Sequence, residues 1–101
     1  MRDPTDTLSQ DADAEQLRKA EDERRRQEVE DIKWLMGHKQ GRRIAWRILS
    51  EAGVYRTTFT GNSTGFMLEG KRSIGLFLLA EINDHCLDQF VTMLKEQKAN
   101  E

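Results

Sequence analysis

Residues Gly37–Gly65, GHKQGRRIAWRILSEAGVYRTTFTGNSTG, decide the fold of this chain. Their first half predicts a helix from about Gln40 to Ala52, because apolar residues recur there at three- and four-residue steps and Gly53 supplies a stop. The expected buried stripe of this helix consists of Ile44, Ile48, Leu49 and Ala52. Residues 54–61 are β-branched and aromatic but have no pairing strand, so we expect an extended, ordered loop.

The chain before this stretch predicts a charged helical arm with a packed foot. Apolar residues recur at helical steps over residues 29–36, and Gly37 is placed to cap the end of that helix. Residues 15–28 are strong helix formers with opposite charges three and four positions apart, but Leu17 is their only large apolar side chain. Such a helix is solvated on all sides, and no apolar heptad supports a coiled coil. Residues 1–14 are polar and acidic, so we expect them to be disordered.

The chain after the loop predicts one or two further helices. A third helix is expected over about residues 65–84, with Asn62 or Ser63 able to cap its first free N–H groups. Its C-terminal half is apolar nearly all round, so it is either the centre of a bundle or a contact with another subunit. The pattern resets at residues 84–86, which favours a fourth helix to about Lys98, although one bent helix remains the alternative. The expected buried side of the third helix consists of Phe66, Gly70, Ile74, Phe77, Leu78, Glu81 and Ile82.

Together these elements predict an all-α fold. A small domain of three to four helices at residues 29–98 follows an arm at residues 1–28 that is disordered to helical, and residues 99–101 form a tail. The single cysteine, Cys86, excludes an internal disulfide and fits a reducing cytosol. No apolar run reaches the roughly 18–20 residues that span a membrane, and the acidic N-terminus is unlike a signal peptide.

The residues that could carry chemistry do not form a recognisable catalytic or metal site. His85 and Cys86 point about 100° apart on a helix, and no second Cys/His pair exists to complete a zinc shell. Glu69 and Glu81 are isolated carboxylates in a charged chain, which predicts solvation or salt bridges rather than acid–base catalysis. The glycines match no phosphate-binding motif. We therefore expect no enzyme activity, no metal or cofactor, and no small-molecule substrate.

The strongest electrostatic signal is a basic group in the body of the chain. Residues 1–31 hold 11 acidic and 6 basic residues, whereas residues 32–101 hold 10 basic and 7 acidic residues. The basic group consists of Lys33, His38, Lys39, Arg42, Arg43, Arg47 and Arg56, with Trp34, Trp46 and Tyr55 interleaved. Three interpretations stay open: a protein contact, a solvated face, or a surface that binds phosphates and stacks bases. The long loop at residues 53–61 disfavours a helix-turn-helix.

The order of short motifs in this chain resembles a known family. The motifs are D-x-x-W-L-M at residues 31–36, G-R-R-x-x-W-R-x-L at 41–49, A-G-V-Y-R at 52–56, F-x-G-N-S at 59–63 and E-G-x-R-x-x-G-L at 69–76. This pattern looks like a family of small proteins from short-tailed bacteriophages, whose usual namesake is a Bordetella phage protein. The resemblance covers residues 31–96 and leaves out the acidic arm.

The resemblance implies a phage protein made in the bacterial host cytoplasm and belonging to the virion or to its assembly pathway. It implies no catalytic residue. We expect a non-enzymatic structural or assembly protein, at the head–tail or portal region or ejected from the virion, that contacts other phage structural proteins and forms a homo-oligomer or symmetric assembly. The alternative is a nucleic-acid-binding module for DNA packaging or regulation. The expected contact surface consists of Trp34, Arg42, Arg43, Trp46, Arg47, Tyr55 and Arg56.

Overall fold

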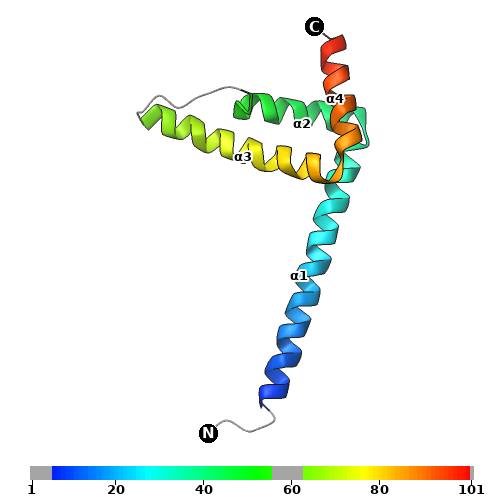
Figure 1. Cartoon of the computed structure of the whole chain (residues 1–101), viewed down its shortest axis with the longest axis vertical. Coiled ribbons are helices and arrows are strands. Elements are labelled where there is room, and N and C mark those ends of the chain that lie inside the picture. The colour runs from blue at the N-terminus through cyan, green and yellow to red at the C-terminus, as the bar shows by residue number, and fades with distance from the viewer. Residues whose placement is uncertain (1–5, 56–62, 101) are drawn as a thin grey trace. The chain divides into compact units, whose positions relative to one another are not determined.

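The computed structural model describes residues 6–55 and 63–100, and Figure 1 shows the arrangement of their helices. Across these residues the chain contains no strand, which confirms the expected all-α class. The four helices are α1 (Asp6–Met36), α2 (Lys39–Ala52), α3 (Ser63–His85) and α4 (Leu87–Ala99). None of the four is long and apolar enough to cross a membrane. The chain divides into two units, residues 1–30 and residues 31–101.

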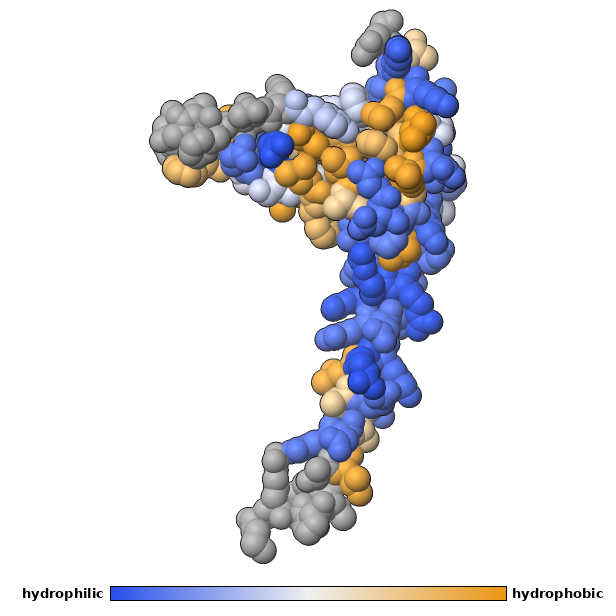
Figure 2. Space-filling model, viewed as in Figure 1, coloured by the Kyte–Doolittle hydropathy of each residue, from blue (hydrophilic) through white to orange (hydrophobic). Residues whose placement is uncertain are grey.

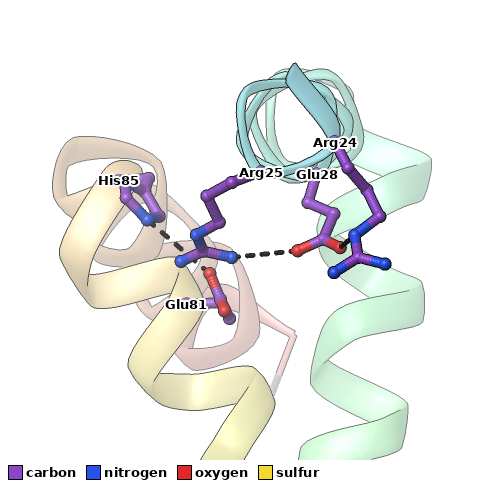
Figure 3. A network of polar contacts seen from close by, with 5 residues as sticks. All are labelled: Arg24, Arg25, Glu28, Glu81 and His85. Atoms are coloured by element: carbon purple, nitrogen blue, oxygen red, sulfur yellow. Dashed lines mark hydrogen bonds and ion pairs between the residues drawn. The ribbon is translucent and has the colours of Figure 1, made fainter. Parts of the chain in front are cut away.

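The first unit is a charged, exposed helix. Ion pairs within it connect residues one turn apart, among them Glu15–Arg18, Glu23–Arg26 at 2.6 Å, Arg25–Glu28 at 3.2 Å and Arg24–Glu28 at 3.9 Å. Figure 3 shows Arg24 and Arg25 both directed at the carboxylate of Glu28. Such exposed pairs stabilise a helix by about 0.3–0.5 kcal/mol each. The helix therefore depends on local propensity and on these pairs rather than on a packed core.

The helix begins at Asp6, whereas the sequence analysis predicted disorder over residues 1–14. That prediction is wrong for residues 6–14, while residues 1–5 lie outside the described part of the chain. Extending a nucleated helix costs little per residue, and Ala12 and Ala14 have the highest helix propensity. The polar composition of residues 6–14 correctly indicates that they do not pack in a core. It does not show how far a helix that forms in the following residues extends toward the N-terminus.

The second unit, residues 31–101, surrounds one small core. Figure 1 shows α2 and α3 running side by side as an antiparallel pair. The buried side chains come from the end of α1, from α2 and from both later helices: Met36, Ala45, Leu49, Val54, Ile82, Cys86 and Met93. Partly buried Ile32, Trp46, Ala52, Leu78, Leu79 and Phe90 pack around them. The foot of α1 therefore belongs to this domain, as its apolar spacing predicted.

Two glycines let the helix backbones of this domain approach closely. A Cβ built on Gly41 would lie 1.8 Å from the carbonyl oxygen of Leu35. A Cβ on Gly75 would lie 2.5 Å from the Cβ of Ala52 and from a methyl group of Val54. Both distances are far below contact distance. The two glycines therefore fix the approach of α2 to the end of α1 and of α3 to the end of α2.

The predicted helix stops are confirmed, with one difference in geometry. Gly53 ends α2 in the left-handed conformation, at φ 73° and ψ 33°, and its N–H donates to the carbonyl of Ser50 at 3.1 Å. Gly37 follows the end of α1, and its N–H donates to Lys33 at 2.9 Å. Among the described residues, however, Gly53 alone has a positive φ, so Gly37 is not a left-handed cap. Cys86, at φ −142° and ψ 45°, separates α3 from α4, so the bent-helix alternative is wrong.

The expected buried faces of α2 and α3 are partly wrong. Ile44 and Ile48 are 50% and 45% exposed, and Phe66, Ile74 and Phe77 are each more than 60% exposed. Gly70, also assigned to the buried side, is exposed as well. The residues that face the core include Leu49 in α2 and Ile82 in α3, as expected, but also the small residues Gly41 and Ala45 in α2 and Gly75 in α3, which were not expected there. Where backbones approach closely, small residues must face inward, and this requirement outweighs the preference of the largest side chains for burial.

Candidate partner-binding surface

Arg42, which the sequence analysis assigned to the contact surface, is used inside the fold. Its Nε donates to Oε1 of Glu96 in α4 at 2.5 Å, and its Nη1 donates to the carbonyl oxygen of Met36 at 2.9 Å. The two charged side chains are only 15% and 18% exposed. The guanidinium thus connects α2 to α4. It also donates to the Met36 carbonyl, which at the end of α1 has no N–H donor from within its own helix. Arg42 is a link between helices, so little of it remains for a partner.

Arg43 and Arg47 are exposed on α2, one turn apart. Lys39 is exposed one turn earlier, so the three cations form a line along the helix. We call Lys39, Arg43 and Arg47 the basic stripe. The N-cap residue of α2, His38, makes no side-chain capping hydrogen bond, and the first turn of the helix contains no acidic residue. The line therefore presents positive charge over most of the length of the helix.

The three aromatic residues of the expected surface occupy two places. Trp46 packs partly buried against the core and stacks on Tyr55, with ring centroids 5.9 Å apart and ring planes at 29°. Partial burial raises the pKa of Tyr55 above its usual value of 10.0. Trp34, 68% exposed, lies at the end of α1 against the ring of His38 at 4.8 Å. The Nδ1 of His38 lies 2.7 Å from the carbonyl oxygen of Trp34, which holds the imidazole in place.

The expected surface is therefore divided. The structure joins Trp46 to Tyr55, and it places Arg43 and Arg47 on one exposed line. Trp34 instead contacts His38. Arg56, the seventh expected residue, lies outside the described residues.

An open hollow on α2 was missed by the sequence analysis. It has a volume of about 270 Å³ and is lined by Ile44, Arg47, Ile48 and Glu51. Two exposed isoleucines form its apolar part, and one cation and one anion border it. Figure 2 shows apolar residues gathered over the α2–α3 part of the molecule. One feature of the sequence could have predicted this hollow: α2 contains more large apolar residues than one helical face can bury.

The residues considered for catalysis have structural surroundings. Cys86 is 3% exposed, and burial raises the pKa of its thiol above 9.0, opposed in part by the positive charge of Lys33. A neutral buried thiol is a poor nucleophile. His85 Nε2 lies 3.6 Å from a carboxylate oxygen of Glu81, and Arg72 lies 3.9 Å from Glu69. Figure 3 shows the His85 and Glu81 side chains directed at each other. Within residues 6–55 and 63–100, no three His, Cys, Asp or Glu residues are placed to hold a metal ion.

Comparison with known proteins places this domain in a family. Among the curated proteins and the solved structures, none has significant similarity to the chain. The family model of Bbp19-like phage proteins, by contrast, matches residues 32–95. This match takes in the foot of α1, all of α2 and α3 and most of α4, but not the charged arm. Since the match covers more than half of its residues, the chain belongs to the family of Bbp19-like phage proteins.

Proposed function

We propose that this phage protein is a non-enzymatic structural or assembly component that works through protein–protein contact. The observation that carries this proposal is the hollow on α2. Exposed Ile44 and Ile48 line it together with the cation of Arg47 and the anion of Glu51. Apolar side chains bordered by charges of both signs are typical of a protein interface, in which an apolar centre is surrounded by a polar rim.

The chemistry of the basic stripe supports the same proposal. Arginine is enriched among the residues that dominate protein interfaces, because its planar guanidinium recognises carboxylates and also packs on apolar groups. Arg47 belongs to both the basic stripe and the hollow. A partner with an apolar anchor and a neighbouring carboxylate fits this combination. The partners we propose are other phage structural proteins and further copies of this chain, during assembly in the host cytoplasm and within the virion, at its head–tail or portal region or among its ejected components.

A nucleic-acid-binding function is the second candidate. The observation in its favour is the basic stripe, in which Lys39, Arg43 and Arg47 are exposed at four-residue intervals. Such a line can follow phosphates, and each neutralised phosphate contributes about −0.9 to the slope of log affinity against log salt. Glu51 borders the same hollow as Arg47, however, and repels phosphate there. Arg42, which would strengthen the stripe, is held by Glu96.

The test is complementation of a phage that lacks this gene by variants of the full chain. The variant Arg43→Ala/Arg47→Ala removes the exposed cations and leaves Arg42 in its link. The matched control is Lys95→Ala/Lys98→Ala, which removes two exposed cations from α4. We expect the first variant to fold but to reduce particle assembly or its own copy number in purified particles, as measured by mass spectrometry. The control should behave as the wild type.

Two outcomes contradict the proposal. Normal assembly with the Arg43→Ala/Arg47→Ala variant would remove the α2 surface from any role in a phage contact. Sub-micromolar binding of duplex DNA near physiological salt, lost in that variant and kept in the control, would instead establish the nucleic-acid function. A salt titration of the binding separates a phosphate contact from a protein contact.

A further inference from the structure

Helix α3 carries apolar residues on two opposite sides. One side, which includes Gly75 and Ile82, faces the core. The other side is exposed: Phe66 63%, Met67 63%, Ile74 69% and Phe77 65%. At 3.6 residues per turn, these four positions and Gly70 fall within an arc of about 100°. We call Phe66, Met67, Gly70, Ile74 and Phe77 the outer face of α3.

The area of the outer face reaches the lower end of what a specific interface with a second copy buries. A large side chain has roughly 200 Å² of surface, so four side chains that are two-thirds exposed present about 500 Å². Two copies that cover each other's outer face would bury about 1,000 Å², which is the lower limit for a specific protein interface. An occupant smaller than a folded helix would leave much of this area in water.

The outer face is complementary to itself when two copies meet in antiparallel orientation. A two-fold axis midway between Gly70 and Ile74 places Gly70 level with the partner's Ile74, and places Met67 level with the partner's Phe77. A Cβ built on Gly70 meets nothing within 4 Å, so the surface is open above this residue. A bulky side chain thus meets a gap, and it does so twice by symmetry. A two-fold interface requires this kind of self-complementary patch.

Other occupants fit the outer face less well. The arm is rich in charge, and Leu8 and Leu17 are its exposed large apolar side chains in the described residues. Two leucines spaced nine positions apart on a charged helix do not match a continuous apolar face. A lipid surface is favoured by helices whose polar side is rich in Lys and Arg. The charges of α3 are instead mixed: Glu69, Lys71, Arg72, Glu81 and Asp84.

We propose that two copies of this chain pair through the outer face of α3, antiparallel, with Ile74 of each copy seated over Gly70 of the other. The proposed function includes contacts between copies of this chain, and the pairing describes one such contact. It rests on the proposed function only in that respect. It uses a different surface from the hollow and the basic stripe. A failure of the pairing therefore leaves the Arg43 and Arg47 experiment unaffected, and the converse also holds.

The first experiment measures the mass of the full chain by sedimentation equilibrium from micromolar to near-millimolar concentration. We expect the wild type to reach twice its chain mass of 11.7 kDa. The variants Ile74→Glu and Gly70→Phe should weaken the dimer at least tenfold while the circular dichroism spectrum keeps its helical signal. Both positions are exposed, so neither change disturbs the core. The matched control is Leu87→Glu, which places the same charge at a 58% exposed apolar position of α4.

The second experiment tests the orientation of the pair by disulfide trapping. A mixture of a Gly70→Cys chain and an Ile74→Cys chain should form a covalent dimer on oxidation, whereas each chain alone should form much less. Cys86 is buried and serves as the common background thiol. More cross-linking within each single variant than in the mixture would contradict the antiparallel register.

The proposal is overturned if the wild-type chain stays monomeric at near-millimolar concentration. It is also overturned if Leu87→Glu dissociates the dimer as strongly as Ile74→Glu, because the dimer would then use another face. Binding of the monomer to anionic vesicles, lost in Ile74→Glu, would assign the outer face to a lipid surface and contradict the pairing.

Discussion

Arg42 of α2 and Glu96 of α4, 54 positions apart in the chain, form an ion pair that joins the two helices, and Arg42 also donates to the carbonyl of Met36. Both side chains are more than four-fifths removed from solvent. Truncation of either partner leaves the other charge desolvated. We expect Arg42→Ala to lower the free energy of unfolding by about 2–4 kcal/mol, somewhat less than the roughly 3–5 kcal/mol for breaking a fully buried pair, because both side chains keep some exposure. Urea denaturation followed by circular dichroism measures the change.

A double-mutant cycle checks that this loss belongs to the pair. The sum of the losses from Arg42→Ala and Glu96→Ala should exceed the loss in the double variant by about 1 kcal/mol or more. Strict additivity would show that the two residues stabilise the fold independently. Arg43→Ala, at the exposed neighbouring position, should change stability by less than about 0.5 kcal/mol.

Replacing two glycines of α3 by alanine should change the free energy of unfolding in opposite directions. Gly75→Ala places a Cβ 2.5 Å from Ala52 and Val54, so overpacking should cost about 1–3 kcal/mol. Gly70→Ala meets nothing within 4 Å and gains about 0.5–1 kcal/mol from higher helix propensity. Thermal melts at low protein concentration compare the two variants with the wild type. Equal effects at both positions would contradict the close packing of α3 on the end of α2.

Phe77 and Ile82 should differ in the same way. Ile82 is fully buried, so Ile82→Ala should cost about 2–5 kcal/mol. Phe77 is 65% exposed, so Phe77→Ala should cost less than about 1 kcal/mol in the monomer. The denaturation midpoints of the two variants settle the register of α3. A larger loss from Phe77→Ala would restore the buried side that the sequence analysis assigned to this helix.

The thiol of Cys86 should make the domain less stable at alkaline pH. Burial raises its folded-state pKa above the unfolded value of about 9, so the folded state favours the neutral thiol. This contribution is fully present below the unfolded pKa and is lost as the pH rises from that value through the folded pKa. The midpoint of urea denaturation should therefore fall above about pH 9 in the wild type. A Cys86→Ala variant, less stable at neutral pH, should show a smaller fall.

Deletion of residues 1–30 should leave a helical domain that still melts cooperatively. The division of the chain follows Glu30, and Ile32 is the first residue that packs against the core. The loss of helical signal should match the deleted part of α1. A gradual melt of the shortened chain, or a loss beyond the deleted residues, would show that the domain needs the arm.

Local signals were enough to predict the helices and several of their ends. The stop at Gly53, the turn at Gly37 and the break near Cys86 follow from glycine and from a change of apolar phase, both visible within a few residues. The choice of buried side was harder. Periodicity shows that α3 has apolar positions, but two opposite sides qualify, and the close contact of Gly75 with Ala52 decides between them.

The candidate surface was less predictable than the fold for a related reason. The basic spacing of α2 predicts that Arg43 and Arg47 share one face, and both are exposed, but it gives no sign that Arg42 reaches Glu96 across the chain. The apolar spacing predicts that Ile44 and Ile48 lie in the core, whereas both are about half exposed. Large apolar side chains are buried both in a protein's own core and at contacts with a partner. Sequence spacing alone therefore does not tell a core position from an interface position.

The contact at Gly41 has a consequence for how this protein can evolve. Every other amino acid carries a Cβ, which at this position would lie 1.8 Å from the main-chain oxygen of Leu35, and a main-chain atom cannot rotate aside. No single amino acid replacement at this codon is therefore neutral while the helices keep their spacing. A lineage that loses this glycine must first shift α2 away from α1, whereas the open position of Gly70 tolerates drift in a monomer.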